Sequence, residues 1–359
     1  MRLVFQRDGI RTTDFVLPKS NIKVITQHWQ DFVNNILPYP DNFEGRGIVI
    51  CAGGKNYFTC CWILINVLRN ELDCNLPIEI WYRGNEITPE LDEVLMKLNV
   101  TCHNVEDFYD ISPDMSGYVM KPMAILFSHF KEVLFLDADN ICTMNPEFLF
   151  DLPEYKEYGA MFWPDFWTTD KNNQIWEIMG VPANSNKEQE SGQILINKET
   201  CWRELNLALY FNMNNHIYYN YLIGDKDTFR FAWLALKTPF YFIKHEVASC
   251  GYIDEDGLFI GHTMAQHTPD GRIIFLHRNL LKWNETDIQY QTWDKIKKFT
   301  AESVLKIYII YRDFKKAKNV MNLEGDLTLL DFKSLFGDLE SRCLKYLQSL
   351  REEEFYQRL

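Results

Sequence analysis

The stretch VLFLDADNI, residues 133–141, places two carboxylates directly after an apolar run. A short apolar run of this kind predicts a buried strand, and Asp137 and Asp139 would stand at its end. Hard divalent cations prefer oxygen ligands and keep open positions for water and substrate phosphates. The pattern therefore predicts a metal site at a strand end. The alternative is that the two aspartates cap a turn before the next element, MNPEFLF at 144–150.

Strand and helix patterns alternate on the N-terminal side of this stretch. Strands are predicted at GIVICAGG (47–54), LPIEIWYRG (76–84), VTCHNV (100–105) and EVLFLDADN (132–140), and helices at NYFTCCWILINVLRN (56–70), TPELDEVLMKLN (88–99) and YVMKPMAILFSHF (118–130). This order predicts an α/β fold with a mostly parallel central sheet. Ligands bind at the carboxyl ends of the strands in such sheets. Besides the aspartates, Ala52, Gly53 and Gly54 stand at a predicted strand end.

The rest of the chain divides into three expected parts. Further strands are predicted at GAMFWPDFW (159–167), SGQILIN (191–197), SCGYIDEDGLFIGH (249–262) and GRIIFLH (271–277), and helices near 198–212 and 225–236. In residues 338–359, Leu and Tyr recur every three or four residues, which is typical of an amphipathic helix. We expect an N-terminal segment over 1–46, one α/β domain over 47–285 and a helical C-terminal extension over 286–359. The last helix would pack on the body or on a partner, such as a second copy of the chain.

The charge balance limits the class of partner. The chain has 359 residues with 37 Lys and Arg against 50 Asp and Glu, and its net charge is −13. Nucleic-acid binding needs a basic surface for the phosphates, so nucleic acid is excluded as the main partner. A phosphorylated small molecule in a local site stays compatible with this charge.

Cysteine usage and hydropathy bear on the compartment. The nine cysteines include no CxxC pair with zinc spacing and mostly stand in apolar contexts. We expect reduced, buried thiols in an intracellular protein, with a disulfide framework as the alternative. No apolar run reaches the ~18 residues of a spanning helix, and the N-terminus lacks a signal-peptide pattern. The sequence therefore predicts a protein that is cytoplasmic or peripheral to a membrane.

A second apolar run ends in a polar cluster far along the chain. It is IIFLHRNLLKW, residues 273–283. If this strand ends near the first, His277 can supply a nitrogen ligand to a metal such as Mn²⁺, which accepts both oxygen and nitrogen. Lys282 would then meet a phosphate as a point charge. The alternative is a structural histidine that is satisfied at its own strand end.

Four blocks together carry a resemblance to a known family. In this order and spacing, FLDADN (135–140), ESGQILIN (190–197), GDKDTFRFAW (224–233) and FLHRNLLKW (275–283) resemble the fungal α-mannosyltransferases that extend cell-wall mannan with α-1,2- and α-1,3-linked mannose. WPDFW (163–167) and YRGNEI (82–87) agree as well, so the resemblance covers roughly residues 46–285. More distantly, the chain is similar to the glycogenin and lipopolysaccharide galactosyltransferase group. The resemblance implies a GT-A fold, which is a single nucleotide-sugar-binding α/β domain, and retention of anomeric configuration.

The resemblance implies a role for each matching residue. Asp137, Asp139 and His277 would hold Mn²⁺ (or Mg²⁺) on the donor diphosphate, and Lys282 would meet a phosphate. Asp225 and Asp227 would lie near the reacting carbon. The other residues implied to contact the donor are Ala52, Gly53, Gly54, Lys121, Ser191 and Gly192.

Three departures from the related families stand out. Lys226 replaces the glutamine of the distant group, and Lys282 follows His277 by five residues instead of six, without the proline. The membrane anchor expected of Golgi-lumenal members is absent from the sequence. Further candidates have equally plausible structural alternatives: Trp163, Trp167 and Trp176 as sugar-stacking rings or packing; His262 and His267 as acceptor contacts or surface-loop residues; Glu190 as an acceptor contact or a solvated loop charge.

The expected function is that of a metal-dependent retaining glycosyltransferase. It would transfer α-mannose from GDP-mannose to a glycan or glycoprotein acceptor, with donor and sugar implied by the resemblance alone. Three alternatives stay open. The donor could be a UDP-sugar. The chain could be a sugar nucleotidyltransferase, for which Lys55 in AGGKNYF gives a partial phosphate-loop match. It could also be a non-catalytic carbohydrate-binding protein that has kept the fold.

Overall fold

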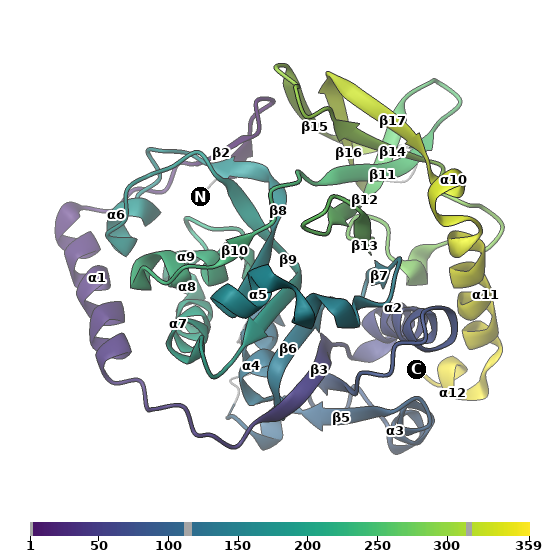
Figure 1. Ribbon diagram of the computed structural model, residues 1–359, viewed down its shortest axis with the longest axis horizontal. Coiled ribbons are helices and arrows are strands. Elements are labelled where there is room, and N and C mark those ends of the chain that lie inside the picture. The colour runs from purple at the N-terminus through teal and green to yellow at the C-terminus, as the bar shows by residue number, and fades with distance from the viewer. Residues whose placement is uncertain (1–2, 111–116, 314–317) are drawn as a thin grey trace.

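The computed structural model describes residues 3–110, 117–313 and 318–359 (Figure 1). Its central sheet has the strand order β1 (Leu3–Phe5), β2 (Ile10–Thr13), β8 (Ala160–Thr169), β9 (Lys187–Asn197), β6 (Phe130–Leu136), β3 (Glu44–Cys51), β4 (Ile78–Tyr82) and β5 (Val100–Asn104), with β10 (Tyr241–Phe242) beside β8. Strands β5, β4, β3 and β6 run parallel to one another. Strand β9 runs antiparallel to both β6 and β8. The predicted α/β fold with a mostly parallel central sheet is confirmed.

Both faces of the parallel strands are buried, as expected for near-continuous apolar strands. In β3, Ile48 and Ile50 face a core with α2 (Gly54–Asn66), while Val49 between them faces a core with α4 (Met120–Phe127). This is the period of two that strand geometry imposes. The remaining helices around this sheet are α1 (Lys19–Asn34), η1 (Val67–Glu71), α3 (Pro89–Met96), η2 (Val105–Asp107), η3 (Gly117–Val119), η4 (Pro146–Asp151), α5 (Pro153–Tyr158), α6 (Ile175–Met179), α7 (Trp202–Met213), α8 (Asn215–Tyr218) and α9 (Lys226–Leu236).

A second, antiparallel sheet lies beside the first and reaches its carboxyl edge (Figure 1). Its order is β15 (Lys306–Asp313), β16 (Lys318–Gly325), β12 (Phe259–His267), β11 (Ala248–Ile253), β14 (Lys295–Phe299) and β17 (Leu327–Asp331), with β13 (Ile273–His277) between β12 and β7 (Asn140–Cys142). Strand β7 begins directly after Asp139, and its first residue, Asn140, pairs with His277. The second sheet thereby brings His277 to the end of β6.

The C-terminal extension is only partly helical, so the expectation of a helical segment from residue 286 onward is wrong. After η5 (Trp283–Glu285), four of the second sheet's strands occupy positions between 295 and 331, and helices α10 (Phe332–Phe336), α11 (Leu339–Glu352) and α12 (Glu354–Gln357) follow. The charge content suggested solvated helix, but KIYIIYRD at 306–313 is rich in β-branched and aromatic residues, which favour strands. The second sheet also contains strands from both sides of the predicted boundary at 285.

Helix α11 packs on the body. Leu344 and Leu347 on its apolar face are buried in the same core as α2. Tyr346 Oη donates to Glu71 Oε1 at 2.7 Å, and the hydroxyls of Thr59 and Tyr356 lie 2.9 Å apart. Because this face is covered within the chain, it gives no support to a homo-oligomer formed through the helix.

The remaining expectations concern thiols and the membrane. All nine cysteines are free thiols, and most are buried. Burial raises the pKa of Cys60 to about 12, because the thiolate would lose its hydration there. In the described parts of the chain, no helix has both the length and the apolar character needed to cross a membrane.

Candidate active site

The loop after β3 packs closely around its glycines. Ala52 is buried, and its backbone N donates to Trp81 O at 3.0 Å. A Cβ at Gly53 would lie 2.1 Å from Glu86 Oε2, so a larger residue would displace that carboxylate. Gly54 has a φ of +62°, in the left-handed region, where it begins α2. The glycines thus shape a tight strand-to-helix turn, and nucleotide contact at this turn stays a prediction.

The two aspartates after β6 face cations. Backbone N of Asp137 donates to Gly192 O at 2.8 Å, which ties the end of β6 to β9. The Asp137 carboxylate lies 3.1 Å from Lys121 Nζ. Asp139 forms a short ion pair with Lys282 Nζ. The turn itself is closed by backbone atoms, with Asn140 N donating to Asp137 O at 3.0 Å. This arrangement favours a charge-binding role for the carboxylates over the turn-capping alternative.

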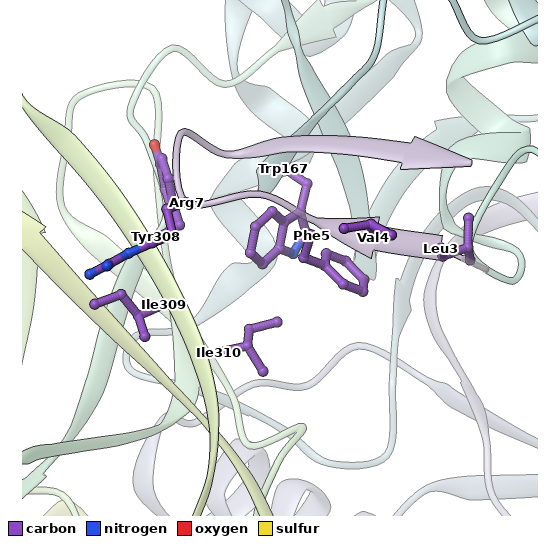
Figure 2. A pocket seen from close by; sticks show the side chains of 8 residues that line it. All are labelled: Leu3, Val4, Phe5, Arg7, Trp167, Tyr308, Ile309 and Ile310. Carbon is purple, nitrogen blue, oxygen red and sulfur yellow. The ribbon is translucent and has the colours of Figure 1, made fainter. Parts of the chain in front are cut away.

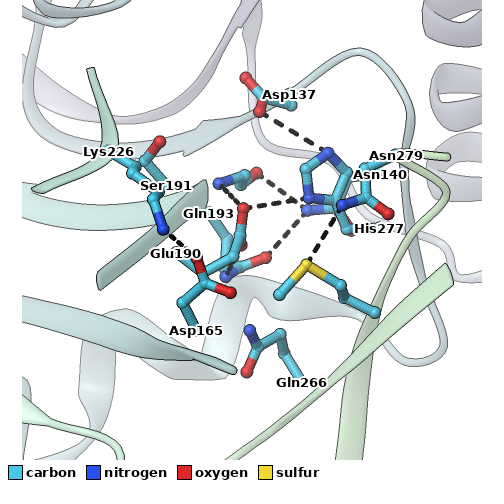
Figure 3. Close-up of polar contacts among 12 residues, drawn as sticks. Asp137, Asn140, Asp165, Glu190, Ser191, Gln193, Lys226, Gln266, His277 and Asn279 are labelled. Carbon is cyan, nitrogen blue, oxygen red and sulfur yellow. Dashed lines mark hydrogen bonds and ion pairs between the residues drawn. The ribbon is translucent and has the colours of Figure 1, made fainter. Parts of the chain in front are cut away.

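His277 lies at the end of β13 beside Asp137, Asp139 and Glu190. Figure 3 shows its contacts with Asp137 and Glu190. Its Nε2 is 3.1 Å from Asp139 Oδ1 and 3.7 Å from Asp137 Oδ2. Its Nδ1 is 3.1 Å from Glu190 Oε1. A Cβ at position 192 would lie 2.5 Å from His277 Nδ1, which explains why glycine occupies this position in β9. The structure therefore joins Asp137, Asp139 and His277, as predicted.

Glu190 belongs to the same cluster, although sequence analysis offered it only as an acceptor contact or a solvated loop charge. It is 6% exposed and lies within β9. Its carboxylate accepts from Gly192 N at 2.7 Å and from Gln193 Nε2 at 2.6 Å. The signal that could have found it is the length of the strand, which begins at Lys187 and so extends the SGQILIN pattern backward through Glu190.

These side chains form a donor set that suits a divalent cation. One ligand atom each from Asp137, Glu190 and His277 lies within 4.8 Å of the other two, and Asp139 stands beside them. Carboxylate oxygens with one imidazole nitrogen suit Mn²⁺, whereas Mg²⁺ prefers oxygen alone. The residues present therefore fit the metal that the resemblance implies.

Lys282 closes one side of the cluster. Its side chain is 28% exposed, against 4% for its partner Asp139. Its Nζ lies 5.1 Å from the centre of the Tyr57 ring, which extends from α2. Tyr57 was not among the predicted site residues, because nothing in α2 alone shows that this position faces the end of β6. The Lys282 side chain thus contacts buried Asp139 and is itself partly exposed to solvent.

Lys121, in the first turn of α4, links Asp137 to Asp225. Its Nζ lies 2.9 Å from Asp225 Oδ2 and donates to both O and Oγ of Ser191 at 2.8 Å. Ser191 Oγ in turn donates to Asp225 Oδ2 at 3.3 Å. With Asp137 also bound, the ammonium is fully engaged by protein groups. Lys121 therefore positions carboxylates here, and direct contact with the donor stays a prediction.

The two predicted catalytic aspartates lie in different surroundings. Asp225 stands at the N-terminus of α9 but makes no side-chain hydrogen bond that caps the helix, and its carboxylate faces Lys121 and Ser191. Asp227 is 0% exposed, pairs with Arg230 Nε at 2.9 Å and accepts from Gln189 N at 3.0 Å. Of the two, Asp225 is the one that Lys121 connects to Asp137.

A second charge network adjoins the first along β9. Lys226 pairs with Asp165 through a short contact and with Glu188 at 2.8 Å. Arg11 Nε, from β2, lies 2.7 Å from Glu188 Oε1. Lys226, which replaces the glutamine of the distant group, is therefore engaged in ion pairs with Asp165 and Glu188. Figure 3 shows the pair with Asp165.

The pKa shifts follow from burial and pairing. Burial raises the pKa of Asp137 to about 6, against the opposing effect of Lys121 and His277. Burial also disfavours charge on Asp139, but His277 and Lys282 outweigh it and lower the pKa of that carboxyl. Burial opposes the imidazolium of His277, yet Asp139 and Glu190 raise its pKa above the ordinary value. In the metal-free cluster, a proton on His277 therefore supplies positive charge that the carboxylates require.

The remaining ring candidates are mostly packed. Trp163 donates to His267 O at 2.8 Å and Trp176 to Asp170 O at 3.0 Å, and both are buried. His262 and His267 are buried within β12, so the surface-loop alternative is wrong for both. Their predicted turn begins only after β12 ends. The packing alternative therefore holds for Trp163 and Trp176.

Trp167 differs because it lines a groove between the N-terminal hairpin and β15 (Figure 2). Its ring lies 4.6 Å from Phe5 and 6.0 Å from Tyr308, measured between ring centres. The groove has a volume of about 550 Å³ and is lined by Leu3, Val4, Phe5, Arg7, Trp167, Tyr308, Ile309 and Ile310. No lining residue belongs to the carboxylate cluster.

Comparison with known proteins shows which family the chain resembles. The model of the family described as "Mannosyltransferase putative" matches residues 45–189 and 181–268. The chain is 28% identical to alpha-1,2-mannosyltransferase MNN22 of Candida albicans, in an alignment over 86% of this chain and 62% of that protein. It is 27% identical to alpha-1,2-mannosyltransferase MNN2 of Saccharomyces cerevisiae, over 70% and 50% of the two chains. The chain thus spans only about half to three fifths of these relatives.

A solved structure also matches in part. The mannosyltransferase Ktr4p of Saccharomyces cerevisiae in complex with GDP is 12% identical with a TM-score of 0.38, over 62% of this chain and 77% of that chain. The family match covers both the strand end that carries Asp137 and Asp139 and the segment that carries Asp225. The architecture found here is the α/β fold with a mostly parallel central sheet that the sequence predicted. The chain belongs to this family of mannosyltransferases.

Proposed function

We propose that this protein is a metal-dependent, retaining glycosyltransferase that transfers α-mannose from GDP-mannose to a glycan acceptor. The observation that carries the proposal is the convergence of Asp137, Asp139 and His277, whose Nε2 lies 3.7 Å and 3.1 Å from the two carboxylates. Family membership and the names of the relatives support mannose as the sugar. GDP-mannose as donor and retention of configuration rest on the family resemblance.

Asp137, Asp139 and His277 would hold Mn²⁺ or Mg²⁺. The orientation of His277 supports this set, because Nε2 faces the two aspartates while Nδ1 faces Glu190. Metal-binding histidines commonly donate their second N–H to a carboxylate, which fixes the ring. Glu190 is then a positioning residue. A divalent ion bound here would offset the negative charge on the leaving diphosphate.

Lys282 would exchange one partner for another when the donor binds. In the ligand-free protein its ammonium neutralises Asp139. With a cation bound beside Asp139, Lys282 would be available to donate to a phosphate oxygen, where it would act as a point charge. Its partial exposure supports this movement, because 28% of the side chain already faces solvent.

Asp225 would stabilise positive charge on the sugar. As the bond from the anomeric carbon to the diphosphate breaks, the sugar becomes oxocarbenium-like, and a fixed carboxylate stabilises it. Lys121 and Ser191 hold Asp225 in place, at 2.9 Å and 3.3 Å. The acceptor hydroxyl would then attack from the same face, and its proton would pass to the leaving diphosphate. Because the bond forms on the face that the diphosphate leaves, the configuration is retained.

The sugar nucleotidyltransferase alternative loses its main support. Its phosphate-loop candidate was Lys55, whose Nζ lies over the Tyr356 ring at 4.7 Å from the ring centre. That ring belongs to α12, and Lys55 therefore points to the C-terminal helices. The non-catalytic and UDP-sugar alternatives require experiment.

The test is thermal unfolding with a panel of nucleotide-sugars, followed by assays of donor hydrolysis and transfer with and without Mn²⁺. A ligand at 100 times its Kd stabilises the native state by about 2.7 kcal/mol. At ~2.1 cal/mol/K per residue, this corresponds to a Tm increase of roughly 3–4 °C for a chain of this size. We expect this increase for GDP-mannose only with Mn²⁺ present, together with Mn²⁺-dependent turnover.

The outcomes separate the alternatives. Stabilisation by a UDP-sugar but not by GDP-mannose would overturn GDP-mannose as the donor. The proposed glycosyltransferase activity would remain. Pyrophosphate release from a nucleoside triphosphate and a sugar phosphate would favour a nucleotidyltransferase. Donor binding without any turnover on a panel of mannosides would favour the non-catalytic protein. Undiminished activity after chelation would overturn the proposed metal dependence.

A further inference from the structure

A second group of metal-ligand side chains lies away from the candidate active site. It consists of Glu79 in β4, His103 in β5 and His129, which directly precedes β6. One ligand atom from each lies within 4.8 Å of the other two. Asp137 follows the other end of β6, so a strand of roughly 20 Å separates the two groups along the chain. The second group is therefore independent of the donor site.

The carboxylate of Glu79 is held in place by groups that are not ligands. Trp81 Nε1 donates to Oε2 at 3.0 Å, and the backbone N of His129 donates to Oε1 at 3.0 Å. Glu79 is 3% exposed. Its ion-pair partners in the described structure are the two histidines, at 3.0 Å for His129 Nδ1 and 3.8 Å for His103 Nε2. A buried carboxylate requires a counter-charge. The buried Lys198 ammonium interacts electrostatically with Glu79, and a protonated imidazole or a bound cation would be the direct partner.

His103 has a ring nitrogen without a hydrogen-bond partner. Its ring packs on Trp81 with centres 5.0 Å apart, and its side chain is 14% exposed. Nε2 is buried and makes no hydrogen bond in the described structure. The 3.8 Å separation from Glu79 Oε2 is too long for one. Most buried polar atoms have a partner, so an unpaired nitrogen facing a carboxylate requires an explanation.

We propose that Glu79, His103 and His129 bind a divalent transition-metal ion of the Zn²⁺ class. Two imidazoles and a carboxylate are a common zinc donor set that leaves one position open for water. Zn–N and Zn–O distances of about 2.0–2.1 Å place tetrahedral ligands roughly 3.3 Å apart. The site must therefore contract slightly, and His129 can supply the movement because its side chain is 67% exposed.

The rival interpretation is a hydrogen-bonded structural cluster. It accounts for the contact between His129 and Glu79 at 3.0 Å. It leaves His103 Nε2 without a partner, whereas a metal ion would satisfy all three side chains. The site would also fasten the junction between α4 and β6, the elements that carry Lys121 and lead to Asp137.

The test is a titration of the chelator-treated full chain with Zn²⁺ and Co²⁺ by calorimetry and absorption spectroscopy. The donor site is first weakened by Asp137→Ala, so that the remaining binding reports on the second group. We expect one Zn²⁺ per chain in this background, together with the intense visible d–d bands of low-coordinate Co²⁺ and a higher Tm. Adding His129→Ala should weaken Zn²⁺ binding at least tenfold and remove those bands.

The matched control is His28→Ala, which removes an exposed histidine from α1. It should leave the Zn²⁺ affinity of the Asp137→Ala background unchanged. His103→Gln tests the buried ligand, and circular dichroism shows whether that variant is folded. Absence of a Zn²⁺ equivalent in the Asp137→Ala background would overturn the proposal. Equal loss of affinity in the His28→Ala and His129→Ala variants would overturn it as well, since binding would then be nonspecific.

Discussion

Two buried charge networks share strand β9 and differ in their balance of charge. In the first, around Glu188, each carboxylate has a lysine or arginine partner in the described structure; the pairs are Arg11–Glu188, Lys226–Glu188, Lys226–Asp165 and Arg230–Asp227. In the second, around Glu190, more carboxylates converge than lysines; the carboxylates are Asp137, Asp139, Glu190 and Asp225, and the lysines are Lys121 and Lys282.

The difference favours a structural role for the first network and supports the binding role proposed for the second. In a balanced network each buried carboxylate is neutralised by a lysine or arginine. Removing one partner leaves an uncompensated buried charge. A network with excess carboxylates requires a further cation. In the metal-free protein, protonation of His277 supplies it, because Asp139 and Glu190 raise the pKa of that imidazole against the effect of burial. Residues only two positions apart in one strand thus serve different purposes.

The largest effect is expected from Asp137→Ala, which removes a carboxylate from the unbalanced network. Turnover should fall by at least 10³-fold, or about 4 kcal/mol of transition-state stabilisation, because the diphosphate loses its metal bridge. Nucleotide affinity should fall too. Stability should change little, since Lys121 keeps Asp225 and Ser191 as partners. Steady-state transfer assays and thermal unfolding measure both quantities.

Asp31→Ala is the control for this substitution, because Asp31 is exposed in α1 and lies in neither network. It should leave turnover and Tm unchanged. Full activity of Asp137→Ala in chelator-treated buffer would show that the unbalanced network does not hold a catalytic metal.

The next effect is expected from Arg11→Met, which breaks the balanced network. Breaking a buried ion pair by removing one partner costs about 3–5 kcal/mol. We expect a loss of this size in the free energy of unfolding, measured by denaturant titration, with turnover per folded molecule retained. Arg7→Met is the control, because its side chain is 72% exposed and should change stability by less than ~0.5 kcal/mol. A stable Arg11→Met variant would remove the structural role assigned to this network.

Asp225→Asn tests the comparison at the point where a residue of the second network, Asp225, lies two positions from a residue of the first, Asp227. We expect at least a ~100-fold loss of kcat, equivalent to ~2.7 kcal/mol of electrostatic stabilisation. Donor Kd and Tm should stay nearly unchanged, because the charge acts mainly in the transition state. Asp227→Asn should do the reverse, lowering Tm through loss of the Arg230 pair. Normal turnover with earlier melting of Asp225→Asn would make Asp225 structural and leave Asp227 as the better catalytic candidate.

The smallest effect is expected at His267, a buried base with no carboxylate partner. Burial lowers its pKa from 6.5 to about 3. Between these values the unfolded chain binds a proton that the folded chain does not, so stability falls as the pH drops from about 6.5 toward 3. The contribution is at most ~1.4 kcal/mol per pH unit.

The measurement compares the pH dependence of unfolding in wild type and His267→Gln. The difference in unfolding free energy between the two should shift in favour of the variant by about 1 kcal/mol between pH 6.5 and 5.5. His216→Gln, at an exposed position of α8, is the control and should follow wild type. A constant difference across this range would show that His267 titrates alike in both states.

The sequence by itself determined the elements that local pattern encodes. Apolar runs with glycine or aspartate ends predicted the parallel strands, and the order of four polar blocks predicted that Asp137, Asp139 and His277 belong together. The local pattern was insufficient in the segment from 286 to 331. Its many charged residues suggested helix, although its β-branched and aromatic residues form strands. It also left Glu190 outside the site, because the start of β9 at Lys187 depends on pairing with β8 and β6.

Only the tertiary structure decided what each charge faces. Asp225 and Asp227 stand two residues apart in one predicted motif, yet one faces Lys121 and the other Arg230. Glu79, His103 and His129 lie in separate elements, and nothing in the sequence indicates that they meet. The physical reason is that periodicity fixes which face of an element is buried, whereas the partner across that face depends on strand order and register. The Asp227–Arg230 pair is local to α9, whereas the Asp225–Lys121 pair joins residues far apart in the sequence, so only the fold could show it.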